Sequence, residues 1–377
     1  MEIITLILFV IILLYAFSIG ILAYGFKKVP YFEGSELHPK NHFSIIVPFR
    51  NEVENLPDLL YSFSQLDYPR NQFEIVFVND SSEDNSIEVI KNFPVLSFNF
   101  KVIEAVRSTG SPKKDAITTA IGAIESDWII TTDADCFVNQ NWLKKIDQYI
   151  QINEVDLIVG AVSFVSGTSF LSQFQQLDMM SLQGATVGSF GVGKPFMCNG
   201  ANLAYKKQLF QTLNGFDGNS QTASGDDVFL LQKAILHKEI GPAKIHYLKA
   251  AEALVLTKDL SSWGAVFQQR IRWASKSASY ESNFGKYMAL IVFAGNLIIV
   301  LSFFLTLFSL FSFWNWYLLV AIKIFADFAI LYQSGKFLKP AKIKFFLLIN
   351  LFYPFFSSTV ALYSLFGKYN WKGRSFR

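Results

Sequence analysis

Hydrophobic positions divide the 377-residue chain into three stretches. Residues Ile3 to Phe26 form an almost uninterrupted apolar run, which at helical rise is long enough to cross a bilayer. Glu2 precedes this run and Lys27 and Lys28 follow it, whereas a secretory signal carries its positive charge before the apolar stretch. We therefore expect an uncleaved membrane anchor over residues 1–28 with its far end in the cytoplasm, and a signal peptide is the alternative.

Between residues 42 and 280, short β-rich runs alternate with segments of helical pattern. This alternation predicts an α/β domain with a mostly parallel sheet. The expected strands are Phe43–Pro48, Glu74–Asn79, Lys101–Ala105 and Trp128–Thr132. The expected helices are Glu54–Gln65, Asp84–Phe93, Lys113–Ile124 and Asn141–Ile150.

Apolar character returns after Lys286 in three blocks, Tyr287–Phe311, Tyr317–Tyr332 and Phe345–Phe366. We expect a C-terminal membrane region over residues 286–367 with two or three transmembrane helices, followed by a basic tail over 368–377. The middle block contains Lys323 and Asp327, which are spaced to pair on one helix face. If all three blocks cross the membrane, the basic tail ends outside, against the positive-inside tendency, unless one block is re-entrant or interfacial.

Composition supports a membrane protein and excludes other classes. Half of the residues are hydrophobic, 39 are Phe, and the mean hydropathy is +0.31. The net charge of +3 and the lack of a basic stripe argue against nucleic-acid binding. Cys136 and Cys198 have neither CxxC spacing nor nearby His partners, so we expect free thiols in a reducing compartment rather than a disulfide framework or a zinc site.

Carboxylates follow two of the expected strands. Asp80 comes directly after Ile75–Val78 and Asn79, and Asp133 and Asp135 come after Ile129–Thr132. In open α/β sheets, ligands bind beyond the carboxyl ends of the strands. An Asp-x-Asp pair there offers hard oxygen ligands for Mg²⁺ or Mn²⁺, which can bridge the phosphates of a nucleotide-sugar. Asp-Ala-Asp is also a common turn sequence, so this pattern alone leaves both interpretations open.

The order of the motifs along the chain is more specific than any one of them. They are Val47-Pro48-Phe49-Arg50-Asn51-Glu52, Val78-Asn79-Asp80, Lys113-Lys114, Thr132-Asp133-Ala134-Asp135, Asn199-Gly200-Ala201-Asn202, Gly225-Asp226-Asp227 and Gln269-Arg270-Ile271-Arg272-Trp273. This set, which spans roughly Phe43 to Trp273, resembles the membrane-bound family 2 glycosyltransferases of GT-A fold. That group includes polysaccharide synthases and ceramide glucosyltransferase.

The resemblance implies roles on the donor side of the site. Asp80 would hold the nucleoside, with Glu52 near the uracil and Arg50 close by. Lys113 or Lys114 would meet the diphosphate. The expected metal ligands are Asp135, as the principal one, and Asp133, which would also lie near the donor sugar and ribose.

The resemblance also implies roles on the catalytic and acceptor side. Asp227 would be the catalytic base, and Asp226 stands where the family's pair has Glu. Gln269, Arg272 and Trp273 match the Q-x-x-R-W motif, which contacts the diphosphate and the acceptor side, and Asn202 belongs to an acceptor-site loop. Local alternatives are a helix N-cap at Asp226-Asp227 and a solvated helix face at Arg270 and Arg272.

Together these expectations describe an inverting glycosyltransferase with a GT-A-type nucleotide-sugar-binding domain and transmembrane helices at both ends. The expected partners are a nucleotide-sugar donor, with UDP as the nucleotide, a lipid, lipid-linked or polysaccharide acceptor, and membrane lipids. A divalent cation is the expected cofactor, and the cytoplasmic face of the cell membrane is the expected location. The alternative is a non-catalytic, membrane-bound nucleotide-sugar-binding partner subunit, whose signature would be loss of the base or of the metal ligands.

Overall fold

The computed structural model describes residues 2–94, 98–165, 167–219, 224–237, 243–275 and 281–376. The expected domain boundary at residue 280 and the terminal Arg377 lie outside the described residues. The chain forms two compact units. We call Pro30–Val165 with Met197–Lys258 the α/β unit, and Met1–Val29 with Ser166–Phe196 and Asp259–Arg377 the helical unit.

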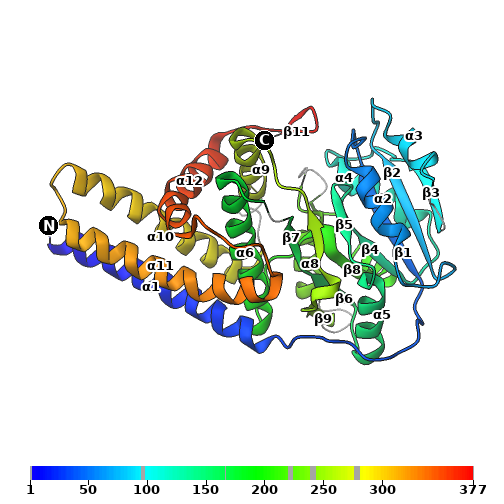
Figure 1. Ribbon diagram of the computed structural model, residues 1–377, viewed down its shortest axis with the longest axis horizontal. Coiled ribbons are helices and arrows are strands. Elements are labelled where there is room, and N and C mark those ends of the chain that lie inside the picture. The colour runs from blue at the N-terminus through cyan, green and yellow to red at the C-terminus, as the bar shows by residue number, and fades with distance from the viewer. Residues whose placement is uncertain are drawn as a thin grey trace. The chain divides into compact units, whose positions relative to one another are not determined.

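The α/β unit is built on a seven-stranded sheet in the order β3-β2-β1-β4-β8-β6-β9 (Figure 1). Its strands are β3 (Asn99–Glu104), β2 (Phe73–Asn79), β1 (Phe43–Phe49), β4 (Trp128–Thr131), β8 (Leu203–Lys206), β6 (Leu157–Gly160) and β9 (Ile245–Leu248). All neighbouring pairs are parallel except those that β8 makes with β4 and β6. This arrangement confirms the predicted mostly parallel sheet. A smaller sheet joins β5 (Cys136–Val138), β10 (Val255–Thr257) and β7 (Val162–Phe164).

Helices accompany these strands, and the first four of those named below are predicted from the sequence. They are α2 (Leu56–Ser64), α3 (Ser86–Lys91), α4 (Pro112–Gly122), α5 (Trp142–Ile152), α7 (Lys207–Thr212) and α8 (Asp226–Leu236), with short 3₁₀ turns η1 (Gly200–Asn202) and η2 (Ala251–Ala253). The predicted helices and strands up to α5 agree with the observed ones to within two residues at each end. Proline in the first turn favours the starts of α2 and α4. The central strands are continuous apolar runs because both of their faces are buried.

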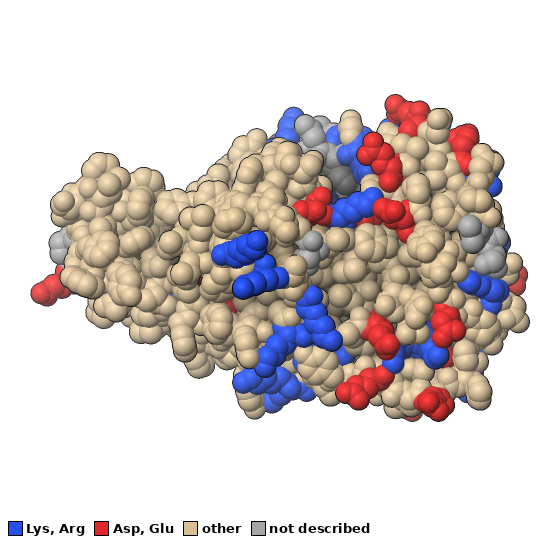
Figure 2. Space-filling view, viewed as in Figure 1, with Lys and Arg blue, Asp and Glu red and all other residues tan. Residues whose placement is uncertain are grey.

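Among its described residues, the helical unit contains four helices that are long and apolar enough to cross a membrane. These are α1 (Glu2–Lys28), α10 (Asn283–Leu307), α11 (Phe313–Leu338) and α12 (Phe346–Phe366). Figure 1 shows α1, α10 and α11 side by side, and on the face drawn in Figure 2 their surface carries almost no charged side chains. The predicted pairing inside α11 is confirmed, since Lys323 Nζ lies 2.6 Å from Asp327 Oδ2.

Three further elements of the helical unit are α6 (Phe170–Gly191), α9 (Trp263–Ser275) and a hairpin of β11 (Tyr369–Trp371) and β12 (Arg374–Phe376). Helix α6 packs against α1 at glycines. A Cβ at Gly188 would lie 2.3 Å from the carbonyl oxygen of Leu22, and one at Gly191 would lie 1.8 Å from that of Gly25. Small residues allow this close backbone approach, as at helix contacts in membrane proteins. Residues 166–196 therefore belong with the membrane helices although both flanking segments belong to the α/β unit.

Candidate active site

Arg50, directly after β1, organises the loop that follows β2. Its Nη1 donates to the carbonyl oxygens of Asp80 at 2.8 Å and Ser81 at 2.5 Å, and its Nη2 pairs with Glu83 at 2.8 Å. The family resemblance places Arg50 near the nucleoside. In the structure, Arg50 holds the backbone at Asp80 and Ser81.

Asp80 is buried at the end of β2, with 6% of its surface exposed. Its Oδ1 accepts from Arg107 Nη1 at 2.9 Å, and Arg107 Nε lies 3.2 Å from Asp115 Oδ2. Arg107 belongs to no motif and was missed by the sequence reasoning. Its place shortly after β3 was the available signal, because that strand ends at the same sheet edge. Glu52 is also buried, and its Oε2 accepts from Asn55 Nδ2 at 2.7 Å.

Four charged side chains from three segments, Lys113, Asp133, Asp226 and Asp227, converge beyond β4. Lys113 Nζ, from the first turn of α4, lies 2.7 Å from Asp133 Oδ1 and 3.3 Å from Asp226 Oδ2. Burial alone would lower the pKa of Lys113, but Asp133, Asp226 and Asp227 together raise it above its usual value. Lys113 therefore stays protonated among three carboxylates. At this position the ammonium group of Lys113 can donate to a bound diphosphate in place of one of the carboxylates.

Asp227 is placed by the turn at Gly200. The backbone N–H of Gly200 donates to Asp227 Oδ2 at 3.0 Å, and Thr131 Oγ1 of β4 donates to the Gly200 carbonyl oxygen at 2.6 Å. A Cβ at Gly200 would lie 2.8 Å from Asp226 Oδ2, so only glycine fits without a shift. The motif Asn199–Asn202 thus brings the sheet edge and the acidic pair together.

The acidic pair does not cap α8. The N-cap residue is Gly225, with a φ of 88° and no side-chain cap hydrogen bond, and Asp226 and Asp227 are the first two helical residues. The N-cap alternative suggested by the sequence is therefore wrong for both residues. Their charges still interact favourably with the positive end of the helix dipole.

Asp133, Asp135 and Cys136 form a candidate metal site. Their ligand atoms all lie within 4.8 Å of one another. Cys136 is buried, and burial together with Asp135 and Asp133 raises the pKa of its thiol. A protonated thiol is a poor ligand, whereas carboxylate oxygens suit Mg²⁺ and Mn²⁺. The residues present therefore fit a divalent cation held by Asp133 and Asp135. Neither Cys136 nor Cys198 forms a disulfide, as expected.

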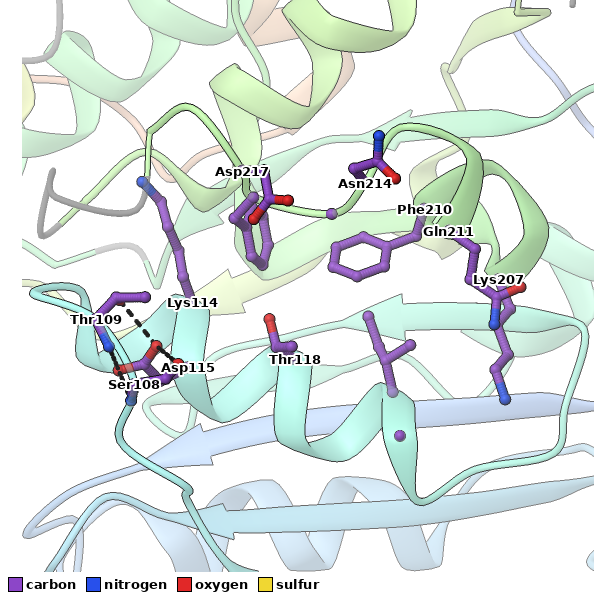
Figure 3. Close-up of a pocket in the computed structure, with 14 residues that line it drawn as sticks. Ser108, Thr109, Lys114, Asp115, Thr118, Lys207, Phe210, Gln211, Asn214 and Asp217 are labelled. Carbon is purple, nitrogen blue, oxygen red and sulfur yellow. Dashed lines mark hydrogen bonds between the residues drawn. The ribbon is translucent and has the colours of Figure 1, made fainter.

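Lys114 has other partners than Lys113. Its Nζ donates to the carbonyl oxygen of Asn219 at 2.7 Å and lies 5.0 Å from the centre of the Phe229 ring. Lys114 lines a cavity of about 550 Å³ between α4 and α7, where Asp115 accepts from Ser108 and Thr109 (Figure 3). No other residue assigned a role from the sequence lines this cavity. The role of Lys114 at the diphosphate stays a prediction.

Asn202 is fully engaged inside the α/β unit. Its Nδ2 donates to the carbonyl oxygens of Ala161 at 2.7 Å and Ala253 at 2.8 Å, and its Oδ1 accepts from Trp142 Nε1 at 3.1 Å. These bonds tie the Gly200 turn to α5 and η2. The predicted role of Asn202 toward the acceptor stays a prediction.

Gln269, Arg272 and Trp273 lie on α9 in the helical unit. The alternative of a solvated helix face is wrong for Arg270, which is only 6% exposed. Arg272 and Trp273 are half-buried.

Residues 44–213 match the family model described as Glycosyl transferase family 2. The chain carries a glycosyl transferase family 2 domain. The resemblance inferred from the motif order is thereby confirmed for a segment that includes Arg50, Asp80, Lys113 and Asp133. Asp227 and α9 lie beyond that segment, so their roles stay predictions.

Curated relatives of this domain are glycosyltransferases. Poly(ribitol-phosphate) beta-N-acetylglucosaminyltransferase TarS of Staphylococcus aureus is 28% identical over 125 residues, 33% of this chain and 22% of TarS. Poly-beta-1,6-N-acetyl-D-glucosamine synthase of Staphylococcus epidermidis is 25% identical over 263 residues, 68% of this chain and 60% of the synthase. The chain thus matches less than two thirds of the length of each relative.

A solved structure confirms the GT-A-type fold. The mannosyltransferase PcManGT from Pyrobaculum calidifontis, solved in complex with GDP-Man and Mn²⁺, aligns with a TM-score of 0.57. The alignment covers 97% of this chain and 99% of that chain at 17% identity. The likeness therefore extends over the helical segments as well as the α/β unit.

Proposed function

We propose that the protein is an inverting, membrane-integrated glycosyltransferase. It takes a sugar from a nucleotide-sugar, with UDP as the nucleotide, and passes it to a lipid, lipid-linked or polysaccharide acceptor. The observation that carries this proposal is the convergence of Lys113, Asp133, Asp226 and Asp227 beyond β4, with Asp80 at the end of β2, two strands away in the same sheet.

The proposed reaction is a single displacement. The acceptor hydroxyl oxygen forms a bond to the anomeric carbon while the bond from that carbon to the diphosphate oxygen breaks. Asp227 takes the hydroxyl proton, and the diphosphate leaves with the electron pair of the broken bond. Attack opposite to the leaving group inverts the anomeric centre and needs one base, unlike the two carboxylates of a glycoside hydrolase.

The leaving diphosphate gains negative charge, so fixed positive charge beside it accelerates the reaction. Lys113 supplies one such charge. A divalent cation held by Asp135 and Asp133 would supply Lewis-acid stabilisation of the phosphate oxygens. The Mn²⁺ and GDP-Man named for PcManGT support a cation of this kind. From the motif resemblance, Gln269, Arg272 and Trp273 would meet the diphosphate and acceptor.

The membrane helices and the relatives support a proposed acceptor and location. Nucleotide-sugars are made in the cytoplasm, so the α/β unit would lie on that side of the cell membrane. The glycopolymer products named for TarS and for the synthase support a glycan acceptor, and the four apolar helices among the described residues support a lipid-bound one.

The proposal is tested with purified membranes that contain the protein. A panel of radiolabelled nucleotide-sugars is supplied, and products are separated into lipid and polymer fractions. We expect one donor to label one fraction, and the label to disappear in Asp227→Asn. If the wild type binds a donor but transfers sugar from none of the panel, the result would instead support a non-catalytic partner subunit.

A further inference from the structure

Arg270 links the two ends of the Q-x-x-R-W motif. Its Nη1 donates to Gln269 Oε1, and its guanidinium carbon lies 4.3 Å from the centre of the Trp273 ring. Stacking and donation by one planar guanidinium fix the orientation of both neighbours. The rotamer of Arg270 therefore sets how Gln269 and Trp273 are presented.

Asp178 of α6 holds Arg270 in place. Arg270 Nε lies 2.5 Å from Asp178 Oδ2, and each side chain is only 6% exposed. A charged group this far from water requires a partner, and a charge-assisted hydrogen bond is the strong kind. Loss of the Asp178 charge would leave the guanidinium buried without its counter-ion, so Arg270 would have to move.

Tyr353 of α12 fixes Asp178 from the other side. Its hydroxyl donates to Asp178 Oδ1 at 2.8 Å, so the two carboxylate oxygens accept from two different helices. The ring of Tyr353 also lies 5.8 Å from Lys323 Nζ of α11. One continuous polar chain thus connects the membrane helices to the motif on α9.

We propose that Asp178 and Tyr353 are positioning residues for sugar transfer. They hold Arg270, and through it Gln269 and Trp273, in the arrangement that the diphosphate and acceptor require. This inference rests on the proposed function. Misplacement of a contacting group by about 1 Å can cost on the order of a hundredfold in rate, so the loss of one hydrogen bond in this chain is measurable.

The first experiment compares two identical chemical changes on one helix. Tyr353→Phe removes only the hydroxyl that donates to Asp178. Tyr363→Phe makes the same change on α12, where the Tyr363 ring packs 5.6 Å from that of Phe267 on α9. We expect kcat to fall about tenfold in Tyr353→Phe and to stay within twofold of wild type in Tyr363→Phe, with both proteins folded. Equal kcat values for the two variants would overturn the proposal.

The second experiment is a double-mutant cycle with Asp178→Asn and Arg270→Gln. If Asp178 acts through Arg270, the double variant loses little more kcat than Arg270→Gln alone. Asp178→Glu, which keeps the charge, should recover part of the loss. Independent effects that multiply in the double variant would show that Asp178 supports the fold and not the motif.

A third readout does not depend on transfer. Acrylamide quenching of tryptophan fluorescence is measured for each protein and for the same protein carrying Trp273→Phe. The difference between the two measurements is the contribution of Trp273. We expect this difference to rise in Asp178→Asn, because Arg270 no longer covers the indole, and not in Tyr363→Phe. If the wild type transfers no sugar, the proposed function fails, and unchanged quenching in Asp178→Asn would separately refute the positioning role.

Discussion

The assignment of Asp227 as general base makes the sharpest prediction. Asp227→Asn removes the proton acceptor and keeps the shape of the side chain. A positioned base contributes a factor of roughly a hundred to ten thousand, which corresponds to about 2.7 to 5.4 kcal/mol of activation free energy. We expect turnover to fall by that factor while the donor still binds.

The stability cost of Asp227→Asn can be estimated separately from its contacts. The two carboxylate oxygens of Asp227 accept from the backbone N–H groups of Gly200 and Val228, at 3.0 and 2.8 Å. An amide has one oxygen, so one of these buried donors loses its partner at a cost of about 1 to 3 kcal/mol. Turnover should therefore be measured well below the melting temperature, which we expect to fall by several degrees.

Two comparison variants separate the roles. Asp135→Asn should weaken cation-dependent donor binding as well as turnover, since it removes an expected metal ligand. Asp226 lies on the same first turn of α8 as Asp227, and its carboxylate pairs with Lys113. The effect of Asp226→Asn should therefore appear in donor affinity. Near-normal turnover in a folded Asp227→Asn protein, measured beside a turnover loss in Asp226→Asn, would refute the assignment.

Three further predictions concern the metal, the orientation and the buried ion pair. Removal of divalent ions should abolish transfer and Mg²⁺ or Mn²⁺ should restore it, whereas full activity in chelator with no metal retained would contradict the role of Asp133 and Asp135. A reporter fused after Lys28 should read cytoplasmic, and an extracytoplasmic signal would overturn the argument on donor access. Lys323→Met alone should destabilise the protein by about 3 to 5 kcal/mol in detergent unfolding, because it leaves the largely buried Asp327 beside Tyr15 without its cation. Lys323→Met with Asp327→Leu should cost less than that. Equal or larger loss in the double variant would show that the pair does not act as a unit.

The sequence predicts the first half of the α/β unit well for a physical reason. Strands β1, β2 and β4 are short apolar runs bounded by turn residues, and parallel strands buried on both faces have that pattern. Their carboxyl ends share one sheet edge, so the clustering of Asp80 and Asp133 near that edge follows from local sequence alone.

Contacts between segments far apart in the chain were not predictable in this way. Arg107 reaches Asp80 from a loop with no motif, and Asp178 lies on a helix whose neighbours in sequence belong to the other unit. Nothing in the sequence around Asp178 indicates that it pairs with Arg270, which lies 92 positions later. Such pairs depend on tertiary packing, which periodicity does not encode.

The contacts of α9 also bear on the side of the membrane at which the chain ends. The described part of helix α9, Trp263–Ser275, has 13 residues and is about 20 Å long, less than a hydrocarbon core of about 30 Å. It begins at Trp263, five residues after Lys258, and five residues cannot span the hydrocarbon core. We therefore propose that α9 stays at the membrane face at which Lys258 lies.

Helix α12 runs along α9 and ends against it. The Phe352 ring lies 5.4 Å from Trp263 near the start of α9, and Tyr369, after α12, packs with Ile271 near the end of α9. We therefore propose that the tail with Lys368 and Lys372 lies on the α9 side and that α1, α10 and α11 are the crossings. This arrangement would remove the conflict with the positive-inside tendency. A reporter at Arg377 should read cytoplasmic like one after Lys28, and opposite readings at the two positions would show that α12 crosses the membrane.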